Sequence, residues 1–215
     1  MKLPPSASVA NPSEGAMLHA PAAVRNADVL TALIAAHAPE TGDALEIASG
    51  TGQHVVRFAA QCPELRWHPT EVDPARRASI DAYAAQSGLP NLTPASALDA
   101  CAPSWSQNMG GKDLIVVINL LHLISTPQAK TLIVEAAYAL SPNGVLVLYG
   151  PFKRAGSLTS AGDQRFDAEL RAADPAIGYK DDADVANWLS DAGLTLESCK
   201  EMPANNLSFI ARKPQ

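Results

Sequence analysis

The chain has 215 residues, of which 47% are hydrophobic and 18% are charged, so it can bury one sizeable core. Its 16 Lys and Arg against 22 Asp and Glu give a net charge of −6, without a block of like charge. Duplex nucleic acids and anionic membranes attract clustered Lys and Arg, so this composition argues against both as partners. A local basic pocket remains compatible with it.

The longest apolar stretch, 114–124, is interrupted by Asn119 and His122 and is much shorter than the roughly 20 residues that cross a bilayer. We therefore expect no transmembrane helix. Residues 1–16 contain no apolar run, so we expect no secretory signal and a cytoplasmic location. The cysteines are odd in number and far apart, which fits neither a disulfide framework nor a metal site: Cys62, Cys101 and Cys199.

Residues 1–16 are rich in Pro, Ser and Ala and have no periodicity, which predicts a flexible N-terminal arm before a single domain over 17–215. Pro21 begins a helix in which apolar residues recur at helical spacing as far as His37. The apolar run 44–48 then predicts the first strand.

Strand and helix patterns alternate along the next hundred residues. Helices are expected at 52–61 and 75–87, with a third from the cap Thr126 to about Leu140; strands are expected at 65–70, 92–95, 114–119 and 145–150. Continuous apolar strands are typical of a parallel sheet covered by helices on both faces.

The chain after Gly150 shows a different order. Two helices, 166–173 and 182–192, come first, and two strands, 195–201 and 206–212, follow across a turn at Pro203 and could pair antiparallel. We therefore expect an α/β fold with a mostly parallel sheet.

The segment Ala48-Ser49-Gly50-Thr51-Gly52 joins the first predicted strand directly to a helix. Glycines at such a turn let the backbone approach a ligand, and the first N–H groups of the helix face whatever is bound there. A single glycine turn is weak evidence, because many α/β proteins use one to reverse the chain.

Acidic residues follow three successive strands. Glu71 lies 19 residues after Gly52, where a carboxylate can accept both hydroxyls of a ribose, and Asp73 follows it. Asp99 could accept from the exocyclic amine of an adenine, and Glu46 could hold an ammonium group. Each acid alone is better explained as a surface carboxylate or a helix cap, but their order at successive strand ends favours a nucleoside site.

This pattern resembles the class I S-adenosylmethionine-dependent methyltransferases, whose motif reads acid-x-Gly-x-Gly-x-Gly. Ala48 replaces the first glycine, which is tolerable if that residue has a negative φ. A dehydrogenase motif would instead have glycine where Val55 stands. The resemblance implies a Rossmann-like, seven-stranded sheet with a final antiparallel strand, and S-adenosylmethionine as cofactor.

Four segments also resemble a narrower, little-characterised family that includes human methyltransferase-like 26: residues 21–26, 49–54, 149–154 and 202–206. Residues 166–171 fit as well, but Gly162-Asp163 stands where that family has Ser-Asn. If the family's Asn contacts substrate, this chain has a different specificity. The resemblance implies the cofactor but no particular substrate, and the expected cofactor-binding residues are Arg25, Asn26, Glu46, Ala48, Ser49, Gly50, Gly52, His54, Glu71, Asp73, Leu98, Asp99 and Asn119.

Methyl transfer from a sulfonium needs in-line approach and exclusion of water more than a strong base. His122 follows the strand at 114–119 and could orient or deprotonate an acceptor; the alternative is a buried histidine bonded to backbone. Lys153 and Arg154 could hold a carboxylate or phosphate, or lie in a solvated loop. The expected acceptor-site residues are His122, Tyr149, Lys153, Arg154, Asn205 and Asn206.

The sequence thus predicts a methyltransferase that uses S-adenosylmethionine and acts on a small molecule, anionic if Lys153 and Arg154 contact it. One alternative is transfer of another group, such as aminopropyl, from a sulfonium nucleoside. Another is a non-catalytic S-adenosylmethionine-binding partner of a different enzyme.

Overall fold

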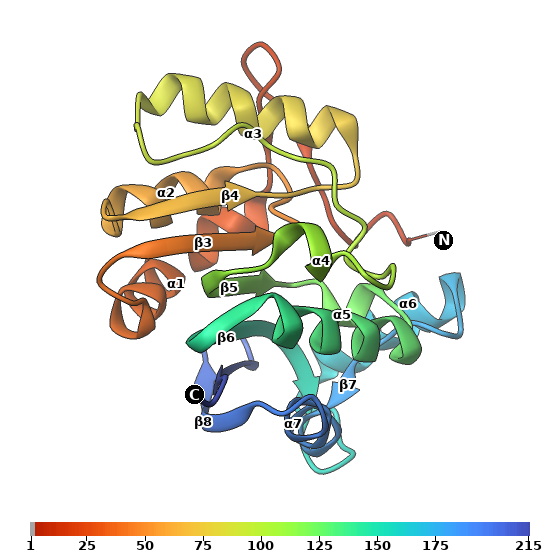
Figure 1. The fold of residues 1–215 in the computed structure, drawn as a ribbon. Helices are drawn as coiled ribbons and strands as arrows, with labels where there is room; N and C mark the ends of the chain where they lie inside the picture. The colour runs from red at the N-terminus through yellow and green to blue at the C-terminus, as the bar shows by residue number, and fades with distance from the viewer. Residues whose placement is uncertain (1–2) are drawn as a thin grey trace.

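The computed structural model describes residues 3–215, which form a twisted seven-stranded sheet with helices on both faces (Figure 1). The strand order is β4-β3-β5-β6-β9-β8, and β7 pairs with the end of β6. The strands are β3 (Gly42–Ile47), β4 (Leu65–Pro69), β5 (Lys112–Ile118), β6 (Leu140–Lys153), β7 (Lys180–Asp181), β8 (Thr195–Met202) and β9 (Asn206–Arg212). The register is parallel from β4 to β6, and β9 is antiparallel to both β6 and β8. The predicted fold class is confirmed.

Alternate residues of the central strands divide the core in two. On one face, Leu45 and Ile115 pack beneath α5 (Thr126–Ala139) and α7 (Asp182–Asp191). On the other, Ala44 and Leu114 pack beneath α1 (Pro21–His37) and α2 (Gln53–Gln61), with α3 (Pro74–Ser87) beside β4. Since successive side chains point to opposite faces, an uninterrupted apolar run is what two covered faces require.

The predicted strand at 92–95 is wrong. Leu92 and Ser96 form only isolated bridges, to Trp67 and Thr70. Pro94 lies between them and has no N–H to donate, so a continuous ladder cannot form there. The seventh strand is instead the two-residue β7.

Two helix starts also differ from the prediction. The N-cap of α5 is Ser125, which forms a capping box with Gln128, and Thr126 is the first helical residue. The helix α6 (Ala161–Ala173) begins five residues before the predicted start, because Ser160 Oγ accepts a hydrogen bond from Asp163 N at 3.1 Å. A four-residue helix, α4 (Ser106–Met109), and a 3-10 turn, η1 (Leu121–Leu123), were not predicted.

Residues 3–20 cross the edge of the sheet at which the parallel strands end, as the red segment of Figure 1 shows. They include a short hairpin of β1 (Asn11–Pro12) and β2 (Leu18–His19). Leu18 N donates to Ser79 Oγ over 2.8 Å, Ala20 N donates to Gln53 Oε1, and Arg76 donates to Ser8 O over 2.7 Å. The segment is therefore attached to α2 and α3; its flexibility and the domain boundary at residue 17 stay predictions.

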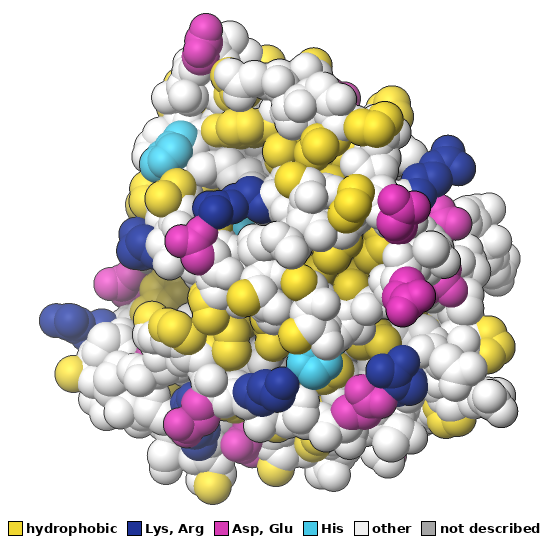
Figure 2. Space-filling view, turned by 90° about the vertical axis from the view of Figure 1, so that its left-hand side faces the viewer, with side chains coloured by type: hydrophobic (Ala, Val, Ile, Leu, Met, Phe, Trp, Pro, Cys, Tyr) yellow, Lys and Arg dark blue, Asp and Glu magenta, His cyan; other side chains and the backbone are white. Residues whose placement is uncertain are grey.

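Within residues 3–215, no helix combines the length and apolarity that spanning a membrane requires. On the face shown in Figure 2, Lys and Arg side chains stand among Asp and Glu and are separated by apolar and polar atoms.

Candidate functional site

A cavity of about 1170 Å³ lies at the carboxyl edge of the sheet. Its walls come from the turn after β3, the ends of β4 and β5, the η1 turn, helix α6 and the N-terminal segment. Ligands in open α/β folds are held at this edge, where the strand order reverses.

Two glycines in the turn after β3 are required by geometry. Gly50 has φ +60° and Gly52 has φ +92°, a region that L side chains rarely adopt. A Cβ on Gly52 would also lie 2.7 Å from the Cα of Ile80, so α3 could not pack against the turn. Ser49 is buried beside them, and its N–H donates to Thr70 O over 2.8 Å.

The expectation for Ala48 is wrong in one respect. Its φ is +53°, not negative, although it does line the cavity. An L-residue in this conformation brings Cβ close to a carbonyl oxygen, at a cost of about 1–2 kcal/mol. Asn119, at the end of β5, has φ +54° and also lines the cavity. The backbone therefore has a left-handed conformation at a non-glycine residue directly after β3 and again directly after β5.

Glu46 is the most unusual group of the site. Its side chain is 2% exposed, and its Oε2 has no hydrogen-bond partner within the described chain. Burial, with a smaller effect of Glu71, raises the pKa of its carboxyl group to about 8. A buried polar atom without a partner costs roughly 1–3 kcal/mol. A ligand ammonium group, held by the deprotonated form, would satisfy it.

Glu71 is buried next to the glycine turn. Its Oε2 accepts from Gly50 N at 3.1 Å and its Oε1 accepts from Val72 N at 2.8 Å. A carboxylate has about four acceptor positions, so it can still receive ribose hydroxyls. Asp73 acts differently, because it is the N-cap of α3 and accepts from Ala75 N and Arg76 N. Both acids line the cavity.

The remaining predicted cofactor residues are placed as follows. Leu98 and Asp99 line the cavity beyond Glu71, with Asp99 exposed and accepting from Cys101 N. Arg25 and His54 line it from the α1 and α2 side, and burial lowers the pKa of His54 to about 4. Asn26 lies behind His54, with its amide 2.8 Å from His54 Nε2.

The opposite end of the cavity is formed by three rings, which we call the ring cluster: His122, Phe166 and Tyr179. Their centroids are 5.7 Å apart for His122 and Phe166, 6.1 Å for His122 and Tyr179, and 6.2 Å for Phe166 and Tyr179. Burial, together with nearby Lys180, lowers the pKa of His122 to about 3. Its ring nitrogens accept and donate no hydrogen bond within residues 3–215, so the alternative of a histidine bonded to backbone does not describe it.

A polar network holds the ring cluster from outside. Tyr179 OH donates to Asp163 Oδ1 over 3.2 Å, while Asp163 Oδ2 accepts from Thr159, Ser160 and Asn205. Lys180 Nζ donates to Ile124 O and Gly178 O over 2.7 and 2.8 Å. Asp163 therefore positions a ring of the cavity.

The six predicted acceptor-site residues do not all meet. His122 and Asn206 line the cavity, and Asn206 donates to Tyr149 OH over 2.9 Å. Arg154 instead donates to the carbonyls of Asn205 and Asn206, both over 3.3 Å.

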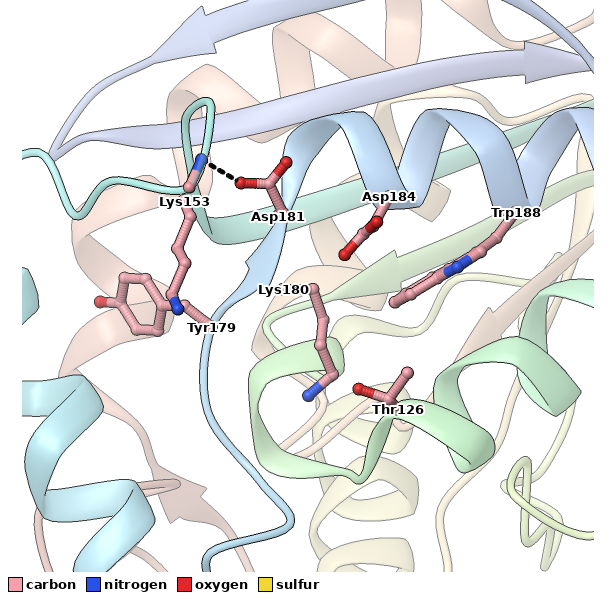
Figure 3. A pocket seen from close by; sticks show the side chains of 8 residues that line it. Thr126, Lys153, Tyr179, Lys180, Asp181, Asp184 and Trp188 are labelled. Atoms are coloured by element: carbon pink, nitrogen blue, oxygen red, sulfur yellow. Dashed lines mark hydrogen bonds between the residues drawn. The ribbon is translucent and has the colours of Figure 1, made fainter.

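Lys153 lies in a separate surface depression of about 370 Å³, next to Asp181 and Lys180 (Figure 3). Lys153 and Asp181 are partners in the strand register, because β6 continues to residue 153 and β7 joins it there. Pattern reasoning missed Phe166 and Tyr179, since no spacing links either residue to a strand end.

A family model described as a protein of unknown function, DUF938, matches residues 17–213. The chain belongs to that family. The match covers the whole sheet and every predicted site residue.

Solved structures with a similar fold are methyltransferases. An O-methyltransferase family protein from Burkholderia thailandensis has a TM-score of 0.76 at 17% identity, covering 90% of this chain and 58% of that one. A putative O-methyltransferase from Nostoc punctiforme has a TM-score of 0.77 at 16% identity, covering 89% and 56%. Human N-acetylserotonin methyltransferase in complex with SAM has a TM-score of 0.74 at 12% identity, covering 90% and 53%. The present chain spans little more than half the length of these proteins, with which it shares the Rossmann-like methyltransferase fold.

Proposed function

We propose that the chain is a methyltransferase that uses S-adenosylmethionine to methylate a small molecule. The observation that carries this proposal is the unpartnered, buried Oε2 of Glu46, which lies under a glycine turn that also donates to Glu71. An ammonium group and a ribose in one ligand would satisfy both acids. The human structure with SAM bound, which has the same fold, supports this choice of ligand.

In this proposal the two ends of the cavity bind different parts of the reaction. Glu46, Glu71 and Asp99 would hold the nucleoside end, and the ring cluster would hold the acceptor. S-adenosylmethionine supplies a methyl group on a sulfonium: the acceptor's lone pair forms the bond to the methyl carbon, and the electrons of the broken C–S bond remain on sulfur. His122 is neutral and can accept a hydrogen bond that orients the acceptor; with a pKa of about 3 it does not retain the proton, which passes to solvent.

Two alternatives have less support. Enzymes that transfer aminopropyl groups need acids for a polyamine, but Asp163, which accepts from Tyr179 OH in the ring cluster, already accepts four hydrogen bonds. A non-catalytic binding protein would need only the nucleoside end, whereas this cavity continues past Asn119 to His122 and Phe166.

Finer assignments also remain proposals. The four matching segments support membership of the narrower group that includes human methyltransferase-like 26. The scattered charges of Figure 2 favour a small molecule over nucleic acid as the substrate. The cytoplasmic location expected from the sequence stays a prediction.

Calorimetric titration with S-adenosylmethionine, S-adenosylhomocysteine and NAD tests the cofactor. We expect heat and a raised melting temperature with the first two, since a ligand that binds only the folded state stabilises it. Binding of NAD alone would contradict the proposal.

A further inference from the structure

The ring cluster forms an enclosed, apolar end of the cavity. His122 and Tyr179 are 6% and 5% exposed, and Phe166 is half-buried. The N-terminal segment covers the cluster with Leu3 and Ala7, and Ala7 packs in one hydrophobic group with Leu123 and Tyr179. A molecule held here would be largely separated from water.

No free charge reaches this end among the described residues. The Asp163 carboxylate is occupied by three hydroxyls and one amide. The Lys180 ammonium is directed at two carbonyl oxygens, and Lys180 lines the outer depression together with Lys153 (Figure 3).

The two arginines that do line the cavity come from other elements: Arg25 from α1, and Arg76 from α3. Arg76 lies near Gly50 and is bonded to Ser8, on the nucleoside side. Arg76 is therefore suited to the cofactor and not to an acceptor at the ring cluster, while Arg25 precedes Asn26, whose amide contacts His54 on the α1 and α2 side.

Burying an unpaired ionic group costs several kcal/mol, whichever its sign. The cation nearest to the ring cluster along the chain, Lys180, does not line the cavity and donates to carbonyl oxygens, so an anionic acceptor would have no cation to pair with there; a cationic acceptor would find no available carboxylate. Aromatic rings add favourable offset or edge-to-face contacts with the inclined rings already there.

Resting on the proposed methyl transfer, we propose that the acceptor is an uncharged aromatic molecule bound among His122, Phe166 and Tyr179. This replaces the anionic acceptor that the sequence suggested from Lys153 and Arg154. Both cations lie outside the cavity because β6 extends to Lys153 and because Arg154 is bonded to the turn carbonyls.

The test compares two probes with the same rings, 2-naphthol and 2-naphthyl phosphate. Each is titrated into the full chain by calorimetry, with and without saturating S-adenosylhomocysteine. We expect 2-naphthol to bind at least tenfold more tightly than the phosphate. Equal or tighter binding of the phosphate, or no binding of 2-naphthol in either condition, overturns the proposal.

The same titrations separate this proposal from the proposed function. If S-adenosylhomocysteine does not bind, the proposed function is wrong, while the titrations without it still decide whether the ring cluster prefers the uncharged probe.

Phe166→Ala should weaken 2-naphthol binding at least tenfold and leave S-adenosylhomocysteine affinity within twofold. Tyr138→Ala, an exposed ring on α5, is the matched control and should change neither affinity. An unchanged naphthol affinity in Phe166→Ala would also overturn the proposal, and the two-probe comparison needs no variant to fold.

Discussion

The backbone N–H of Gly50 donates to Glu71 Oε2 over 3.1 Å, which joins the turn after β3 to the acid after β4. The carboxylate thus has a structural partner before any ligand binds. The oxygen atoms expected to hold a ribose are held in place by the same turn that approaches the ligand, so the site is preorganised.

Replacing Glu71 by Ala is expected to weaken S-adenosylhomocysteine binding roughly ten- to a hundredfold, because loss of a charge-assisted hydrogen bond costs about 1.5–3 kcal/mol. The free energy of unfolding should fall too, since Gly50 N and Val72 N lose their acceptor. Asp73→Ala is the comparison: it should cost about 1 kcal/mol of stability through the α3 cap, with a smaller effect on affinity. Calorimetry and urea denaturation measure both; a larger affinity loss in Asp73→Ala would assign the ribose to Asp73.

Glu46 predicts a specific pH dependence. Its carboxyl pKa is about 8 in the folded chain against an ordinary value of 4.5, so between these values the folded state holds a proton that the unfolded state releases. The free energy of unfolding of the ligand-free chain should therefore decline as pH rises from about 4.5 to about 8. Glu46→Gln should lack this part of the decline in urea denaturation series; an identical pH profile would exclude Glu46 as its source.

The same group predicts proton release on ligand binding. At pH 7 Glu46 is protonated, and pairing with an ammonium group requires the charged form. Titration with S-adenosylhomocysteine in buffers of different ionisation enthalpy should show protons leaving the protein. Glu46→Gln should abolish this buffer dependence and weaken binding; retention of the full proton count would mean that another group titrates.

Ala48→Gly is expected to stabilise the chain. The left-handed conformation of Ala48 costs about 1–2 kcal/mol, whereas the greater freedom of glycine in the unfolded chain costs about 0.4–1 kcal/mol. The net gain should be roughly 0.5–1 kcal/mol by urea denaturation. Ala168→Gly, in the exposed interior of α6, is the control and should destabilise by about 1 kcal/mol. A loss of stability in Ala48→Gly would mean that no strain is relieved.

The start of α5 offers a further test. Ser125→Ala removes the side-chain acceptor of the capping box, while the backbone N–H of residue 125 can still donate to Gln128, and it should lower the free energy of unfolding by about 1 kcal/mol. Thr126→Ala should have little effect, because Thr126 is the first helical residue and not the cap. Thermal or urea unfolding of the two variants decides; a greater loss in Thr126→Ala would restore the sequence-based assignment.

Much of the fold was predictable because its signals are local. Leu114 to Val117 are buried from both sides, so the apolar run itself marks a central strand. The acids Glu46 and Glu71 were predictable for a related reason, since parallel strands end at one edge. By contrast, β7 is two residues long and carries no pattern; it pairs with β6 and supplies the seventh strand, which was expected at 92–95.

The ring cluster was not predictable in the same way. His122 lies in η1, Phe166 in α6 and Tyr179 in the loop before β7, and they meet only through packing and the hydrogen bonds of Asp163 and Lys180. Lys153 and Arg154 are adjacent to a strand end, which made them candidates, but β7 and the turn at Asn205 engage them. Which side chains at a strand end reach a cavity depends on such long-range partners.

The position of β9 inside the sheet has a consequence for synthesis. It lies between β6 and β8, although it is made after every other strand. Until residue 212 has left the ribosome, β6 has an open edge and β8 has no neighbour in the sheet. The unpaired edge of β6 then remains available to other chains, so we infer that the nascent chain is most vulnerable to aggregation until β9 has emerged.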